Sequence, residues 1–313
     1  FMDAAYEVGT QAVLITPARF LFNAGYTPKA WNEKMLADPH LSAPLYVRDS
    51  GELFPGTKIR AGIVVTHRDA SRSGVPIGTF TAFEELNAIL HKVIESGYEP
   101  LEAAGITTGR SYRYTDQMHL DHPQASELLS DGHQYVIGPH AFQRLPSIYS
   151  ETRPTDSHDY VQVLGRDAGK RVLRWIRHDY VDGPESLRKH KVAVPAANEL
   201  NTLGQMAASE VLGPDTAVTQ TFLTIGEFDT RDEAQACSTY LKTKFARVML
   251  YVLKVTQHNP RSTWKYVPNQ DFTASSDINW SKSIPEIDQQ LYAKYGLDAE
   301  EIAFIEEKVK PME

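Results

Sequence analysis

The sequence has 313 residues, a composition close to that of an average globular protein, and a formal net charge of −8. Hydrophobic residues make up 42% and charged residues 23% of the chain, which excludes long disordered, collagen-like or low-complexity stretches. No apolar run approaches the ~20 residues that cross a bilayer, and the N-terminus lacks a signal-peptide pattern. A single cysteine, Cys237, excludes an internal disulfide and a zinc site built on several thiolates. We therefore expect a cytoplasmic protein without a membrane partner.

The charge is unevenly distributed along the chain, although the acidic balance as a whole argues against a histone-like nucleic-acid binder. Residues 234–270 contain six basic side chains and no acidic one, and residues 166–191 contain eight basic and four acidic side chains. Residues 271–313, in contrast, contain ten acidic and four basic side chains. The negative balance is thus partly a property of the tail, and the middle of the chain can still present a positive surface.

The N-terminal 75 residues alternate between predicted helices and predicted strands. Helices are expected at 3–8 and 28–36, and strands at 12–15, 45–47 and 59–68. The first of these strands is a short apolar run that ends at Thr16-Pro17, which is typical of a buried parallel strand. This succession of elements predicts the second half of a doubly wound α/β sheet, without its first half.

A polar turn rich in Gly, Ser and Pro at 69–76 predicts the end of this domain. We expect a domain at 76–270 and then a helical acidic tail at 271–313. The predicted elements are an amphipathic helix at 81–94, a hairpin at 160–181 that turns at Asp167-Ala168-Gly169, strands at 191–195 and 218–225, one long helix at 230–255 and two short helices within 284–309.

Self-contained catalytic signatures are absent from the sequence. It has no phosphate-binding G-x-x-x-x-G-K-[ST], no G-x-G-x-x-G and no G-x-S-x-G motif. His119-Leu120-Asp121-His122 contains side chains that bind metals, but an isolated polar segment of this kind is more often a solvated turn. We therefore expect no metal site.

Two short motifs in the N-terminal part carry a more specific resemblance. Pro17-Ala18-Arg19-Phe20-Leu21 follows a predicted strand, and Phe54-Pro55 precedes Ala61-Gly62-Ile63-Val64-Val65. In this order they resemble the second half of TaqI-like adenine-specific DNA methyltransferases, which also occur in type IIG restriction–modification enzymes. In that family a Pro-Ala loop follows the strand with the catalytic Asn-Pro-Pro-Tyr, and a loop ending in Phe-Pro leads to a β-hairpin.

The C-terminal part is similar to the specificity domain of the same family, which reads the DNA sequence. The similar segments are 191–198, 221–228, 240–245 and 266–271. The Gly/Ser-rich loop that usually follows the Ala-Asn of this domain is replaced here by 198–204. The resemblance implies an α/β fold followed by an α+β fold: the back half of a Rossmann-like methyltransferase sheet, then a TaqI-like DNA-specificity domain with a helical C-terminal tail.

The resemblance gives Phe54 a catalytic role. An enzyme that methylates a base within a duplex must flip that base out and hold its ring by stacking. The Phe of the family's Phe-Pro loop stacks on the flipped adenine and corresponds to Phe54, whereas the residue pattern alone favours a core position beside Pro55. Arg19 follows the carboxyl end of a strand, where α/β sheets place ligands, so it faces the pocket or DNA, or else forms a surface ion pair.

Specific DNA binding needs Lys and Arg side chains that hold phosphates and read guanine edges. The predicted hairpin and the predicted long helix supply most of them, and Trp264 lies in the acid-free window. Together with Arg19, the candidates are Lys58, Lys170, Arg171, Arg174, Arg177, Lys242, Lys244, Arg247 and Trp264. Charge runs are usually solvated faces, and Lys244 has the alternative of extending along apolar surface as a structural residue.

Two motifs that the family's catalysis requires are absent. The sequence has no Pro-Pro dipeptide, hence no Asn-Pro-Pro-Tyr, and no Gly-rich loop for S-adenosylmethionine. In the family both motifs lie upstream of the point that corresponds to Phe1, so we expect a C-terminal fragment of a longer enzyme. The fragment is expected to bind double-stranded DNA, to hold no S-adenosylmethionine and to transfer no methyl group. A broken sheet exposes a strand edge, which predicts a homodimer or partial disorder in the N-terminal part.

Two alternatives stay open at this point. The intact parent is expected to methylate the exocyclic amino group of adenine, and it either also cleaves DNA through an upstream nuclease domain or does not. Alternatively, the chain is a free-standing, non-enzymatic DNA-recognition module.

Overall fold

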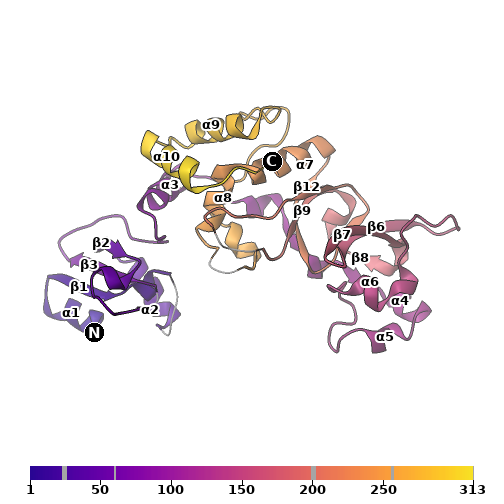
Figure 1. Ribbon diagram of the computed structural model, residues 1–313, viewed down its shortest axis with the longest axis horizontal. Helices are drawn as coiled ribbons and strands as arrows, with labels where there is room; N and C mark the ends of the chain where they lie inside the picture. The colour runs from indigo at the N-terminus through magenta and orange to yellow at the C-terminus, as the bar shows by residue number, and fades with distance from the viewer. Residues whose placement is uncertain (23–26, 60, 199–201, 255–256, 313) are drawn as a thin grey trace. The chain divides into compact units, whose positions relative to one another are not determined.

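The computed structural model describes residues 1–22, 27–59, 61–198, 202–254 and 257–312 (Figure 1). The chain forms two compact units, 1–89 and 90–313, whereas the sequence places the first boundary near residue 75. Both units combine helices with small, mostly antiparallel sheets, and the described residues contain ten α-helices. The expectation of a mixed α/β protein is confirmed at this level. In the described part of the chain, no helix has the length and apolar character needed to cross a bilayer.

The first unit contains a three-stranded sheet of order β1-β3-β2, formed by β1 (Gln11–Pro17), β2 (Leu41–Val47) and β3 (Ile63–Asp69). The central strand β3 runs antiparallel to both neighbours. The prediction of a buried parallel strand at 12–15 is therefore wrong. Its apolar run lies in β1 at the margin of the sheet, where successive side chains alternate between the core and solvent.

One face of this sheet is covered by α1 (Met2–Val8), α2 (Lys29–Leu36) and the 3₁₀ helix η1 (Ala18–Phe22), and the core of the unit lies between them. The other face carries a row of exposed aliphatic side chains. Val13, Ile15 and Leu45 are 65%, 59% and 48% exposed. Ile15 and Leu45 both pair with Val65 of the central strand, so the row crosses all three strands.

We expect this uncovered row to make the chain self-associate, because burying exposed aliphatic area is favourable by about 25 cal/mol per Å². Sedimentation velocity over a range of concentrations should show oligomers for the unsubstituted chain and a shift toward monomer for Val13→Thr/Ile15→Thr. Val75→Thr replaces an exposed valine outside the sheet and serves as the matched control. Monomeric behaviour of the unsubstituted chain at every concentration would contradict this expectation.

The second unit contains three further sheets. Their strand orders are β10-β9-β12-β4, β11-β6-β7 and β5-β8. The strands are β4 (Ile106–Thr108), β5 (Arg113–Tyr114), β6 (Tyr160–Asp167), β7 (Lys170–Arg177), β8 (Val181–Asp182), β9 (His190–Pro195), β10 (Glu210–Leu212), β11 (Thr216–Val218) and β12 (Phe222–Phe228).

The predicted hairpin is confirmed as β6 and β7. Its two central turn residues, Ala168 and Gly169, have φ of 47° and 79°, as the turns that suit twisted hairpins require. The single strand expected at 218–225 is wrong, because the chain turns at 219–221 and passes between two sheets. Before the turn, β11 pairs in parallel with β6; after it, β12 pairs antiparallel with β9 and β4.

The remaining α-helices are α3 (Glu84–Glu95), α4 (Asp116–Asp121), α5 (Ala125–Leu128), α6 (Ala141–Arg144), α7 (Arg231–Lys242), α8 (Lys244–Tyr251), α9 (Ile284–Lys294) and α10 (Ala299–Lys308). The remaining short 3₁₀ helices are, in chain order, η2 (Ser50–Glu52), η3 (Leu101–Ala104), η4 (Gly109–Ser111), η5 (Pro146–Ile148), η6 (His178–Tyr180), η7 (Glu185–Arg188) and η8 (Arg261–Trp264). The helix predicted at 81–94 corresponds to α3.

The long helix expected at 230–255 is divided at Thr243. This residue is extended, with ψ of 148°, and its hydroxyl accepts a hydrogen bond from the Ala246 amide at 3.1 Å. Thr243 therefore caps the start of α8 and separates it from α7. The expected end of the helix at Val255, like residues 199–201 of the loop at 198–204, lies outside the described residues.

The acidic tail belongs to the second unit. Its two predicted helices are confirmed as α9 and α10, which pack against α7 and α8 (Figure 1). The Asp288 carboxylate on α9 accepts hydrogen bonds from the amides of Lys244 and Phe245, at 3.0 and 2.9 Å. Burial raises the pKa of Asp288 to about 6. The tail thus caps the first turn of α8 and is part of the core.

Candidate nucleic-acid interface

Two neighbouring pockets of the second unit form a hollow that we call the arginine groove. The larger has a volume of about 670 Å³ and is bordered by Arg110, Arg166 and His258. The smaller, of about 260 Å³, is bordered by Arg144 and two further histidines. The two pockets share Pro139 and Gln220. None of the described residues that line either pocket is acidic, so the groove is positive in a protein of net charge −8.

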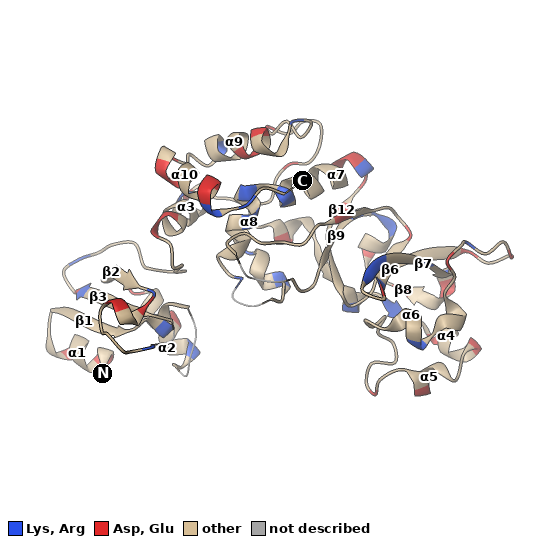
Figure 2. Ribbon diagram, in the orientation of Figure 1, with Lys and Arg blue, Asp and Glu red and all other residues tan. Residues whose placement is uncertain are grey.

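The groove forms where the four-stranded sheet meets the β6–β7 hairpin and α6. Figure 2 shows basic residues on β6 and β7 and at α6. Gly109 allows η4 to approach the turn between β11 and β12. A Cβ at this position would lie 2.2 Å from the carbonyl oxygen of Thr219 and 2.7 Å from that of Phe222. Glycine is therefore required there, and its close packing places the next residue, Arg110, at the mouth of the groove.

Arg110 is held by a neutral partner. With the Gln220 amide oriented to satisfy both partners, its oxygen accepts hydrogen bonds from Nε and Nη2 of Arg110, each at 2.8 Å. Arg110 is exposed, and it forms no ion pair with any described residue. Its full positive charge is therefore available at the surface.

Two arginines of the hairpin lie over one aromatic ring. The guanidinium carbons of Arg166 and Arg171 are 5.8 and 5.7 Å from the ring centroid of Phe222, which is itself buried. Arg166 also donates to the carbonyl of Gly169 at 3.2 Å, and Arg171 to that of Ala208 at 2.6 Å. Arg171 has one distant carboxylate, Glu210, at 4.0 Å. The ring fixes these cations without neutralising them.

The other candidates of the hairpin differ in their charge environment. Lys170 is exposed and has no ion pair with a described residue, so it remains a candidate. Arg174 contacts the carboxylates of Glu151 and Asp167, and Arg177 contacts those of Asp121 and Asp179. These acids raise the pKa of Arg177. Arg174 and Arg177 therefore have structural partners, which weakens the prediction that they bind DNA.

The candidates near α7 and α8 are mostly interior residues. Arg247 is 3% and Trp264 only 1% exposed, so neither is accessible to DNA in this structure. This burial argues against the prediction that Arg247 and Trp264 contact DNA. Lys244 donates to the carboxylate and backbone carbonyl of Glu306, which agrees with its structural alternative. Lys242 is half-buried and has no ion pair with a described residue.

Arg247 instead links three parts of the chain. Its guanidinium donates to the carbonyls of Lys242 at the end of α7 and Thr243 at the start of α8, at 3.0 and 3.2 Å. It also donates to Gly204 at 3.1 Å and to Lys310 at 2.7 Å. A buried cation with all of these acceptors is a structural anchor.

We expect Arg247→Ala to lower the free energy of unfolding by about 3–5 kcal/mol in the absence of DNA, because buried carbonyls lose their donors and a cavity remains. Denaturant titration measures this change. Lys170→Ala, at an exposed lysine, should stay within about 0.5 kcal/mol of the unsubstituted chain. An Arg247→Ala variant of unchanged stability and weakened DNA binding would restore Arg247 as a contact residue.

Two further lysines of the basic windows are also buried. Lys191 on β9 is 0% exposed and donates to the carbonyls of Lys189 and Gly213, each at 3.0 Å. Burial lowers the pKa of Lys191 to about 7. Lys254 donates to the side-chain oxygens of Asn198 and Asn259 near the groove, and burial lowers its pKa to about 8. A count of basic residues along the sequence treats these two buried lysines as surface charge, and it therefore overestimates the positive electrostatic potential of the surface.

Lys191 should make the stability of the protein depend on pH. Below pH 7 the amine is protonated in both states, and the folded state bears the full cost of a buried charge. Between pH 7 and 10.5 only the unfolded chain holds this proton, so stability should rise with pH by up to about 1.4 kcal/mol per unit.

Unfolding measured from pH 6 to 9 should show this rise in the unsubstituted chain and a smaller rise in Lys191→Met. The matched control Lys170→Met replaces an exposed lysine and should keep the original slope. An unchanged slope in Lys191→Met would show that Lys191 titrates normally.

Two of the three candidates of the first unit, Phe54 and Lys58, are exposed. Phe54 is 45% exposed, which excludes the alternative of a core residue. Its amide donates to the Ser50 carbonyl at 2.9 Å, and its carbonyl accepts from the Thr57 hydroxyl at 2.8 Å, so the loop is held in a compact turn. Lys58 is exposed, beside a hollow of about 510 Å³. Arg19 is half-buried in η1, without an ion pair to a described residue.

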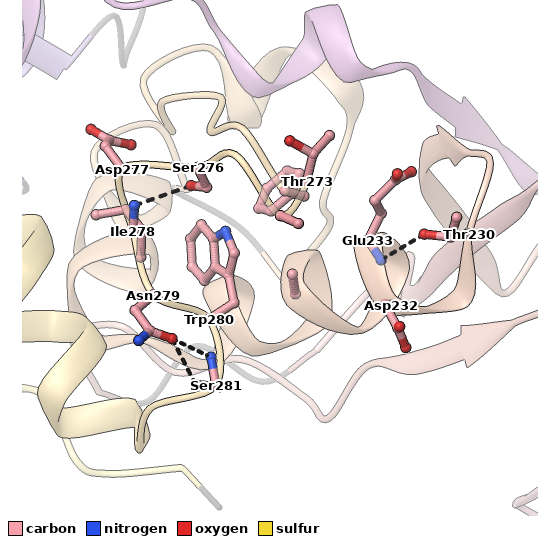
Figure 3. Close-up of a pocket in the computed structure, with 13 residues that line it drawn as sticks. Thr230, Asp232, Glu233, Thr273, Ser276, Asp277, Ile278, Asn279, Trp280 and Ser281 are labelled. Carbon is pink, nitrogen blue, oxygen red and sulfur yellow. Dashed lines mark hydrogen bonds between the residues drawn. The ribbon is translucent and has the colours of Figure 1, made fainter.

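Another pocket of the second unit, of about 700 Å³, has the opposite charge. Its lining includes three carboxylates, and Figure 3 shows Asp232 and Glu233 on one side of Trp280 and Asp277 on the other. These acids repel DNA phosphates, so this pocket does not extend the arginine groove. Nor do the described residues contain a cluster of three side chains able to hold a metal ion. Asp121, within the sequence segment considered for metal binding, accepts from Tyr180 and pairs with Arg177.

No protein-family model and no curated protein matches the sequence. The groove itself was missed by the sequence analysis, which nominated neither Arg110 nor Arg144 nor Gln220. Arg110 lies in η4, Arg144 at the end of α6 and Gln220 at the turn between β11 and β12, and no local motif connects them. The Gly109-Arg110 pair is the sole sequence feature we find that could have indicated the groove. The need for glycine at 109 becomes clear only from its close contact with the turn at 219–221.

Proposed function

We propose that this chain is the DNA-recognition part of an adenine-specific DNA methyltransferase of the restriction–modification type. The second unit binds double-stranded DNA through the arginine groove. The first unit contributes the loop with Phe54 to the base pocket of the intact enzyme. The intact enzyme transfers a methyl group from S-adenosylmethionine to the exocyclic amino group of adenine, and the chain described here holds no S-adenosylmethionine by itself.

The observation that carries this proposal is the acid-free lining of the arginine groove. Two arginines of this lining, Arg110 and Arg166, are fixed by an amide, a backbone carbonyl and an aromatic ring. Each of these partners is neutral, so the cations keep the charge that phosphates neutralise when DNA binds. The contrast with Arg174 and Arg177, which lie on the same hairpin among carboxylates, singles out the groove as a binding surface.

The exposure of Phe54 supports the catalytic part of the proposal. A ring that stacks on a flipped base must be accessible before the base arrives, and nearly half of the Phe54 side chain is exposed. The hydrogen bonds of its backbone to Ser50 and Thr57 fix the turn that presents the ring. Arg19 and Lys58 are the cations of the same unit that we propose as DNA contacts.

Fluorescence anisotropy with a labelled pool of random duplexes tests DNA binding by the full chain. Affinity should fall steeply with salt, because each neutralised phosphate contributes about −0.9 to the slope of log K against log salt. Arg166→Ala/Lys170→Ala should reduce the magnitude of the slope by up to about 2. Lys282→Ala, which removes an exposed lysine from the acidic tail, should leave the slope unchanged.

Two results would contradict the proposal. One is the absence of salt-dependent binding to duplex DNA. The other is an equal loss of affinity in Arg166→Ala/Lys170→Ala and in the Lys282→Ala control, since that would indicate a non-specific effect of net charge.

A further inference from the structure

The hydrogen bonds between Arg110 and Gln220 leave one edge of the guanidinium free. Gln220 accepts from Nε and from one hydrogen of Nη2, which accounts for two of the five N–H donors. No other hydrogen bond joins the Arg110 side chain to a described residue. The free donors of Nη1 and Nη2 therefore point away from Gln220.

The side chains of Arg110 and Gln220 both extend from backbone that is held by close packing and hydrogen bonds. Gly109 packs directly against the carbonyls of Thr219 and Phe222. The Thr219 amide donates to Leu164 of β6 at 2.9 Å, and the Phe222 amide donates to Thr219 at 3.0 Å. The backbone amide of Gln220 donates to the carbonyl of Ile137 at 2.9 Å. The backbone of both residues is thus held relative to two sheets, and the two hydrogen bonds to Gln220 restrict the guanidinium before any ligand binds, which lowers the entropy lost on binding.

An oriented guanidinium edge with two parallel donors matches either a phosphate or a planar base edge. A phosphate also accepts cations from many other directions, so prior orientation of the guanidinium is an advantage chiefly at a base edge. The O6 and N7 atoms of guanine in the major groove lie in one plane, and arginine binds both together. A carboxylate in place of Gln220 would orient Arg110 equally well but would offset the charge that DNA attracts.

We propose that Arg110 is a specificity-determining residue that reads a guanine in the major groove, and that Gln220 positions it. This inference assumes the DNA-binding function proposed above, and it assigns within that function the contact that selects the sequence.

The test is the sequence preference of the full chain, selected from random duplexes and then measured on single base-pair variants of the preferred duplex. Arg110→Ala should lose its preference for guanine at one position, by roughly 5- to 150-fold, and keep its other preferences. Arg110→Lys keeps the charge but not the bidentate geometry, so it should lose the same preference with an unchanged salt slope. Gln220→Ala should weaken discrimination at that same position.

Lys170→Ala is the matched control, because a phosphate contact weakens all sequences alike and lowers the salt slope by about 1. The same uniform behaviour in Arg110→Ala would overturn the inference, as would a chain that binds duplexes without any sequence preference. In both cases the proposed DNA binding would stand. Absence of duplex binding by the unsubstituted chain would instead overturn the proposed function and this inference together. Thermal melting of each variant without DNA separates lost contacts from lost folding.

Discussion

The tight turn at 219–221 is the constraint on which the second unit depends. It takes the chain from β11, in the sheet of the hairpin, to β12, in the centre of the four-stranded sheet. Hydrogen bonds of Thr219 to Leu164 and of Phe222 to Thr219 hold it in place. Gly109 packs on the outside of the turn, and the Phe222 ring lies beneath Arg166 and Arg171. The junction of the sheets and the lining of the groove are therefore one structural feature.

Most charged side chains in the two basic windows serve the fold. Arg247 and Lys191 are buried among carbonyls, Lys244 binds the tail, and Arg177 binds two carboxylates. Even the acidic tail is integrated in this way, since Asp288 caps α8. What distinguishes the groove is the kind of partner that its arginines have. Local charge density along the sequence carries no such information, because a buried cation and a free one count the same.

Several elements were predictable from sequence because their signals are local. The β6–β7 hairpin follows from its turn residues, and the start of α7 follows from the Thr230 cap, whose hydroxyl accepts from the Glu233 amide at 3.2 Å. The secondary-structure predictions were wrong where the local sequence is compatible with two different structures. Thr243 interrupts a helical pattern that continues on both sides, and the Thr-rich turn at 219–221 has the composition of a strand. The candidate site was largely unpredictable, because it combines η4, the hairpin, α6 and this turn, and only the tertiary fold brings them together.

Under the proposed DNA recognition, the neutral pairing of Arg110 with Gln220 has a consequence for how the DNA target would change. Both side chains lie at the surface of a framework that is held by backbone contacts, and neither belongs to the hydrophobic core of the unit. Substitutions at these two positions should leave the packing of the sheets below intact. If the groove recognises DNA as proposed, new target preferences would be reachable through single codon changes, without the loss of folding that usually limits the divergence of binding sites.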